Sequence, residues 1–121
     1  NETEASFYVN HPVETHDDAS KAAKTLLDMG IKNVIITLGE KGAYFANSSE
    51  TFSSPIANLS SPVVDTTGAG DAFNAGFAAA LMENQGIHEA IAFASATAGL
   101  STTKIGTANS MPSREEIDKI L

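Results

Sequence analysis

The sequence predicts an α/β fold on two observations. An alanine- and leucine-rich helical pattern, residues 19–29, precedes the β-branched run 33–38, which is typical of a buried parallel strand. Further along, Val63 and Val64 lead through a glycine-rich loop into a long apolar segment, the pattern of a strand, a tight turn and a helix. Strand and helix patterns therefore alternate, as in α/β proteins.

Composition narrows the class of protein. The chain has 121 residues, 42% of them hydrophobic, with a formal net charge of −8 and no cysteine. This size suits a single domain, residues 1–121. The lack of cysteine excludes disulfides and thiolate metal sites and favours a cytoplasmic protein. The acidic charge argues against nucleic acid as a partner, and no apolar run is long enough to suggest a membrane partner.

The first half is expected to hold two helices followed by strands. Asn1 and Glu4 form a capping-box pattern, and Thr15 suits the cap of a second helix that Gly30 ends. After the strand at 33–38, a four-residue turn at 39–42 leads to further strands at 43–46 and, more weakly, 51–53.

The second half is expected to be mainly helical. The apolar helix after the glycine-rich loop should run to about Asn84 and, being apolar on every face, should be buried between neighbours. A small-residue helix follows over residues 87–102, and Ser113 with Glu116 predicts a last capped helix. We interpret His11, His16 and His88 as solvated surface residues, because their spacing matches no metal site.

The loop before the long helix carries the chemistry. Gly68, Ala69 and Gly70 have little or no side chain, so a ligand can approach their backbone N–H groups closely. The first N–H groups of a helix are unpaired and attract anions. Asp71 lies where it could take a proton from a hydroxyl that attacks a phosphate in this loop. The alternative is that Asp71 only compensates the helix dipole.

A wider pattern resembles the C-terminal motif of the ribokinase-like, or phosphofructokinase-B, sugar kinases. The matching positions are Asp65, Thr66, Gly68, Ala69, Gly70, Asp71, Ala75 and Gly76. The resemblance implies that Asp71 is the catalytic base and that the backbone of Gly68, Ala69 and Gly70 forms the anion hole. It implies, for the fold, the C-terminal portion of a Rossmann-type three-layer α/β/α sandwich.

Weaker motifs extend the resemblance. Residues 37–42 could be a simple hairpin turn, and they are not a Walker A loop, but the family binds ATP on a similar segment, which implies nucleotide contacts at Thr37, Gly39 and Gly42. Ala98 and Thr102 would flank the adenine. The family's Asn-x-x-Glu motif implies that Asn1 and Glu4 help to hold Mg²⁺ through water. A monovalent cation, K⁺, is implied at Asp65, Thr67, Ser101, Lys104, Gly106 and Ser110.

The activity implied is ATP-dependent phosphorylation of a sugar hydroxyl, with ribose as the first candidate and ATP, Mg²⁺ and K⁺ as cofactors. Alternatives stay open: a truncated nucleotide-binding module without catalysis, a kinase of fructose, a nucleoside or a vitamin precursor, or a non-catalytic domain used for dimerisation. Because the chain begins with Asn1 and family members are more than twice as long, we expect a piece of a longer protein, without the sugar-binding part and lid. The full-length protein could be a homodimer.

Overall fold

The computed structural model describes residues 1–121 and divides them into two units, Asn1–Pro55 and Ile56–Leu121. The single domain expected from the sequence stays a prediction. No helix combines the length and the apolar character that crossing a membrane requires.

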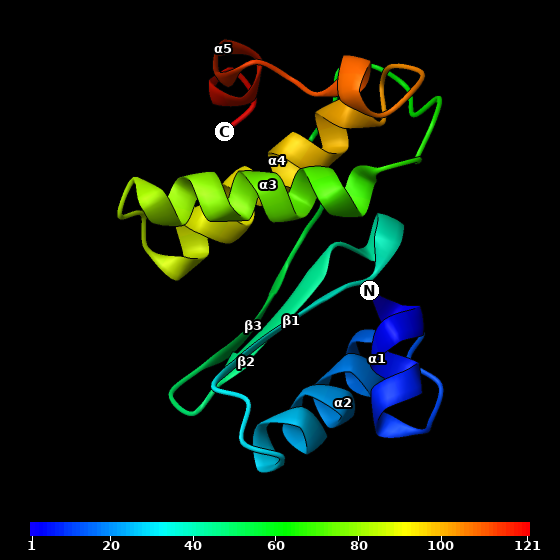
Figure 1. Ribbon diagram of the computed structural model, residues 1–121, viewed down its shortest axis with the longest axis vertical. Helices are drawn as coiled ribbons and strands as arrows, with labels where there is room; N and C mark the ends of the chain where they lie inside the picture. Colours follow the sequence, from blue (N-terminus) through cyan, green and yellow to red (C-terminus); the bar gives the residue numbers. More distant parts are fainter. The chain divides into compact units, whose positions relative to one another are not determined.

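The first unit consists of two helices and a three-stranded sheet (Figure 1). The helices are α1 (Glu2–Val9) and α2 (His16–Asp28), and the strands are β1 (Asn33–Thr37), β2 (Ala43–Asn47) and β3 (Thr51–Ser54). A 3₁₀ turn, η1 (Gly39–Lys41), joins β1 to β2. Both helices begin with capping boxes: the one predicted at Asn1 with Glu4, and one at Thr15, predicted only as a cap, which Asp18 completes.

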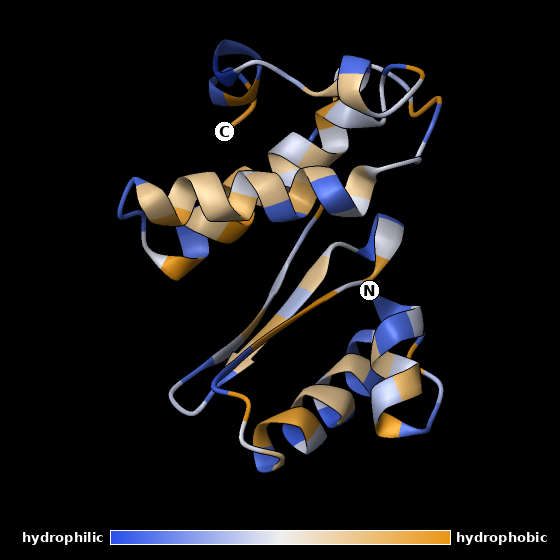
Figure 2. Cartoon of the chain, in the orientation of Figure 1, coloured by the Kyte–Doolittle hydropathy of each residue, from blue (hydrophilic) through white to orange (hydrophobic).

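The core of this unit lies between α2 and one face of the sheet. Ala19, Ala22 and Ala23 of α2 are fully buried, which agrees with the apolar stripe of a helix that is polar on its outer side (Figure 2). They pack in one cluster with side chains that alternate along the strands, namely Val34, Ile36, Tyr44 and Ala46. The Tyr44 hydroxyl donates a hydrogen bond to Ser20 Oγ at 3.1 Å, which ties the strand to the helix.

The prediction of a parallel strand at 33–38 is wrong for the pairing within this chain. β1 pairs only with β2, in antiparallel register from Asn33 opposite Asn47 to Thr37 opposite Ala43. The short turn at 39–42 explains this, because a two- to five-residue connection can only reverse the strand, whereas a parallel partner needs a long crossover.

The second unit consists of helices α3 (Ala69–Met82), α4 (Ile87–Ser101) and α5 (Arg114–Asp118), with a 3₁₀ turn, η2 (Ala108–Ser110). Figure 1 shows α3 and α4 crossing each other, and Figure 2 shows both as mostly apolar. Gly76 permits the close approach: a Cβ built on it would lie 2.6 Å from Thr97 Oγ1 and 3.1 Å from Ala94 Cα. The hydrophobic core of this unit also includes a cluster of buried residues, namely Ala80, Ala90, Phe93, Ala96 and Ile117.

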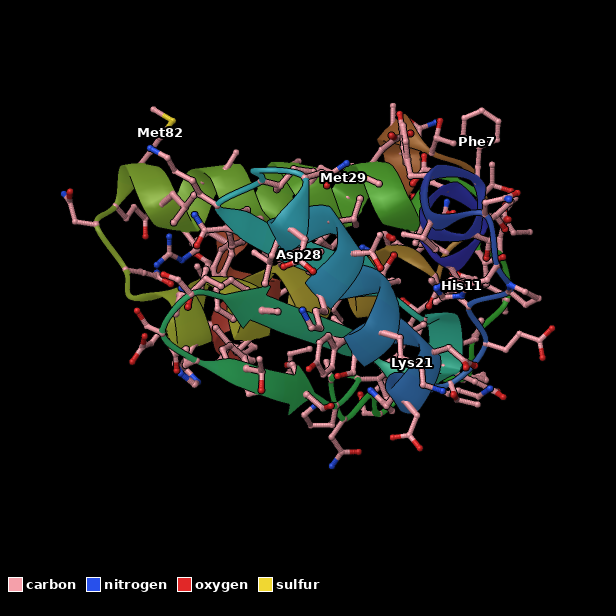
Figure 3. The ribbon with its side chains drawn as sticks, turned by 90° about the horizontal axis from the view of Figure 1, so that it is seen from below. Phe7, His11, Lys21, Asp28, Met29 and Met82 are labelled. Atoms are coloured by element: carbon pink, nitrogen blue, oxygen red, sulfur yellow. The ribbon has the colours of Figure 1, made fainter.

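Two expectations for this unit are wrong. Val63 and Val64 form no strand and are each 56% exposed; the Val64 and Asp65 amides instead donate to the carbonyl of Thr102 at the end of α4. The α3 helix is not buried on every face, because α4 covers only some of its apolar residues. Leu81 is 45% and Met82 is 85% exposed, and Figure 3 shows the Met82 side chain extending away from the ribbon.

Candidate active site at the start of α3

The backbone at the start of α3 presents unpaired amides. Gly68 is the N-cap residue, with φ of 76°, and no side chain caps the helix. The Ala69 amide donates to Thr66 O at 3.2 Å, and the first helical bond runs from the Ala72 amide to Gly68 O at 2.9 Å. The amides of Gly68, Gly70 and Asp71 have no acceptor within the chain. A Cβ at Gly70 would meet nothing within 4 Å, so the space on that side of Gly70 is open. The arrangement therefore suits an anion.

Asp71, like Glu89 of α4, follows a glycine N-cap and takes no part in a capping box. In α1, α2 and α5 the acid three residues after the N-cap, Glu4, Asp18 and Glu116, returns to bond the N-cap amide. Asp71 holds the same position in α3, yet it is exposed and makes no hydrogen bond within the chain. A purely capping role therefore does not account for Asp71.

Asp65 ties the loop before α3 to the loop after α4. Its Oδ1 accepts from the Thr67 amide at 2.9 Å, and its Oδ2 accepts from the Gly106 amide at 3.0 Å. These bonds, first that from Gly106 and then those from Thr67, lower the pKa of Asp65 from 3.8 to about 2. Thr107 lies against Gly68, with its Cγ2 3.1 Å from the place of a Gly68 Cβ. The 104–107 loop thus supports the N-cap of α3.

The residues predicted to hold a monovalent cation gather partly around this junction. Ser101 and Ser110 are buried, and their hydroxyls donate to Ala98 O and Thr107 O. The Lys104 ammonium binds Glu116 Oε1 at 2.9 Å, so only its carbonyl could serve a cation. The Ser113 amide, and then Lys104, lower the pKa of Glu116 to about 2.

The two residues predicted to flank adenine lie in the last turns of α4. Ala98 is half-buried, whereas Thr102 is 8% exposed and its hydroxyl donates to Gly99 O at 2.7 Å. The visible role of Thr102 is structural, because its carbonyl receives the amides of Val64 and Asp65 at 2.8 and 3.1 Å.

The predicted nucleotide loop of the first unit is a closed turn. Thr37 ends β1, the Leu38 amide donates to Gly42 O at 2.7 Å, and the Gly42 amide donates to Gly39 O at 3.1 Å. A Cβ on Gly42 would lie 2.1 Å from Ser54 O, so packing alone demands glycine there. Gly39 has φ of 57° and open space where its Cβ would be. Gly39, rather than Gly42, therefore keeps a face open to a ligand.

Asn1 and Glu4, the residues predicted to help hold Mg²⁺, form a capping box on α1. Asn1 Oδ1 accepts from the Glu4 amide at 3.0 Å, and Glu4 Oε2 accepts from the amino group of Asn1. The Glu4 side chain is 69% exposed, so its second oxygen remains accessible to a hydrated cation.

The sequence did not reveal two of these supports. His16, interpreted as a solvated surface residue, bonds the carbonyl of Lys41 at 3.0 Å and so contacts the 39–42 turn. Thr107 contacts the N-cap of α3 but carries no motif. Neither residue gives a local sequence signal, because each partner lies far along the chain.

Comparison with known proteins shows the family to which this chain belongs. The model of the pfkB family carbohydrate kinases matches residues 1–114, and the chain belongs to that family. The chain is 42% identical over 116 residues to a ribokinase of Haemophilus influenzae, covering 96% of this chain and 37% of that protein. It is 37% identical over 121 residues to a deoxyribokinase of Salmonella typhi, covering 100% of this chain and 39% of that protein.

A solved relative confirms the fold class. The structure of Arabidopsis thaliana ribokinase complexed with ribose and ATP superposes with a TM-score of 0.92 at 38% identity, covering 99% of this chain and 38% of that one. The prediction of a partial ribokinase-like α/β fold is therefore confirmed. The chain spans less than two fifths of the length of these relatives.

Proposed function

We propose that this chain supplies the nucleotide-binding and catalytic part of a kinase that transfers the γ-phosphoryl group of ATP to a hydroxyl of ribose or a related small sugar. One observation favours it most: Asp71, exposed and without a hydrogen bond in the chain, stands at the start of α3 beside amides that no side chain caps. The names of the relatives, ribokinase and deoxyribokinase, support a pentose as the acceptor.

In the proposed reaction, Asp71 accepts the proton of the sugar hydroxyl as the oxygen attacks the phosphorus in line. The amides of Gly68, Gly70 and Asp71 donate to the phosphoryl oxygens, whose negative charge they stabilise without reorganisation. The Ala69 amide, already bonded to Thr66 O, contributes least to this anion hole. Asp65 and Thr107 keep these amides in place.

The residues present fit the cofactors that this reaction uses. Open space beside Gly70 and the amides suits the phosphates of ATP, and Gly39 offers a second open backbone surface. Within the first unit, the accessible carboxylate of Glu4 with Asn1 would hold Mg²⁺ through water, and the ion would supply charge neutralisation for ATP. Asp65, Thr67, Gly106 and the buried Ser101 and Ser110 would supply the oxygens for K⁺.

The test replaces Asp71 in the full-length protein that contains this chain. Asp71→Asn is expected to lower kcat for ribose phosphorylation by about 10²- to 10⁴-fold, because the base is lost. The Kd for Mg·ATP should stay within a few-fold of the wild type. Asp17→Asn, an exposed acid in the first turn of α2, is the matched control and should leave both unchanged. Turnover of Asp71→Asn equal to that of the control would reject the role of Asp71.

A second candidate function, a nucleotide-binding module without catalysis, is favoured by length, because the chain spans less than two fifths of the length of its relatives. By itself it would bind Mg·ATP without catalysis. Calorimetric titration of Mg·ATP into the 121-residue chain, with and without ribose, distinguishes the two. Heat of binding without ADP formation supports the module, whereas ADP formed only when ribose is present shows that the chain is sufficient. Substitution of fructose or a nucleoside for ribose in the full-length assay tests the other acceptors.

A further inference from the structure

His16 links three segments of the first unit. It is the first residue of α2, and its ring nitrogens reach two other elements. Its Nε2 lies 3.0 Å from Lys41 O, at the end of η1, and its Nδ1 lies 3.1 Å from Ser53 Oγ, on β3. The side chain therefore connects the start of α2 to the 39–42 turn and to the neighbouring strand.

The chemistry of the partners fixes the direction of these bonds. A carbonyl oxygen only accepts, so Nε2 must carry the proton that it donates to Lys41 O. Ser53 Oγ can both donate and accept, so it satisfies Nδ1 whether or not that nitrogen is protonated. His16 therefore serves as a hydrogen-bond donor to the turn.

Lys41 returns a second bond to the same segment. Its ammonium donates to the carbonyl of Glu14 at 2.8 Å, two residues before His16. Residues 14–16 and Lys41 thus exchange two hydrogen bonds in opposite directions, one from the His16 ring to the Lys41 carbonyl and one from the Lys41 ammonium to the Glu14 carbonyl. From the other side, Gly42 abuts the carbonyl of Ser54. These contacts hold the turn between α2 and β3.

We propose that His16 is a positioning residue that holds the 39–42 turn in the shape to which the nucleotide binds. This inference rests on the proposed function, because it takes Gly39 and Thr37 as nucleotide contacts. His16 itself touches no ligand; it acts through the Lys41 carbonyl. Loss of the Nε2 donor frees that carbonyl and lets the turn sample other shapes, so ATP must select the productive one.

The experiment uses the full-length protein and four variants. His16→Ala should raise KM for ATP about 3- to 10-fold, the worth of one neutral hydrogen bond, with kcat and KM for the sugar unchanged. His16→Gln keeps an amide donor near the place of Nε2 and should restore most of the affinity. Ser53→Ala leaves the Nε2 bond and should have a smaller effect than His16→Ala. His11→Ala is the matched control, because His11, in the loop between α1 and α2 (Figure 3), bonds only its neighbour Pro12.

Hydrogen exchange gives a readout independent of activity. The Lys41 and Gly42 amides, which bond Leu38 O and Gly39 O, should exchange faster in His16→Ala than in the wild type or in His16→Gln, at unchanged melting temperature. An unchanged KM for ATP and unchanged exchange in His16→Ala would overturn the proposal. A uniform rise in exchange across the unit would also overturn it, because it would show a merely structural role. Failure of the wild type to phosphorylate ribose would instead reject the proposed function and leave the exchange result to decide the role of His16.

Discussion

The carboxylate of Asp65 accepts a hydrogen bond from the amide of Gly106, 41 residues further along the chain. The same carboxylate accepts from Thr67, so one ionised side chain joins the segments before α3 and after α4. Because the ionised form is the better acceptor, this junction depends on pH.

Asp65→Asn should destabilise the protein at neutral pH, and its stability gap to the wild type should narrow in acid. The folded-state pKa of Asp65, about 2, lies below its ordinary value of 3.8, so the carboxylate stabilises the folded state above pH 4. This contribution is lost as pH falls from about 3.8 towards 2. Urea unfolding followed by circular dichroism at neutral pH, pH 4 and below pH 3 measures the gap. A gap that stays constant over this range would contradict the assignment.

Gly76→Ala should destabilise the α3–α4 pair by about 1–3 kcal/mol, because the added methyl group overlaps Thr97 and the backbone of Ala94. Neither neighbour is the free end of a flexible side chain, so the helices must separate. Thermal unfolding measures the loss. Ala78→Gly, at an exposed position on the same helix, is the control and should cost only about 0.5–1 kcal/mol. Equal costs would show that the helices are not in close contact at Gly76.

Gly70→Ala should lower the activity of the full-length protein without lowering its stability. No atom lies within 4 Å of the new Cβ, and alanine favours the helix, so stability should stay the same or rise by roughly 0.5 kcal/mol. The methyl group would stand beside the free amides, where the proposed phosphate binds. We therefore expect a rise in KM for ATP or a fall in kcat of at least about tenfold in the full-length protein. Unchanged kinetics would place the anion elsewhere.

Gly42→Ala should mainly lower stability, whereas Gly39→Ala should mainly weaken ATP binding. Both have positive φ, so each substitution strains the backbone by about 1 kcal/mol. At Gly42 the methyl group also meets Ser54 O at 2.1 Å, so we expect a loss above about 2 kcal/mol. At Gly39 the methyl group projects into open space, so the larger effect should be on the Kd for Mg·ATP. Denaturant titration and calorimetry on each variant distinguish the two roles.

Local signals in the sequence predicted the helix starts well. The capping boxes at Asn1 and Ser113 and the cap at Thr15 were all predicted, because each of these signals lies within a few consecutive residues. The turn at 39–42 and the start of α3 were predicted for the same reason. Pairing was harder, because the direction of β1 depends on which strand lies beside it.

The supports of the candidate site could not be predicted. Asp65 meets Gly106 across 41 residues, and His16 meets Lys41 across 25, so no short pattern contains both partners. Val63 and Val64 have the composition of a strand, but the carbonyl of Thr102 takes the amides of Val64 and Asp65. Tertiary contacts thus overrode the local β preference.

β1 has a neighbour on one side only, while Val34 and Ile36 on its inner face are almost fully buried. Its outer row of N–H and C=O groups is a template on which a further extended segment can add. Solutions of the isolated 121-residue chain should accordingly self-associate as concentration rises, through sheets shared between molecules, whereas a longer polypeptide that lays its own strand along β1 would stay dispersed.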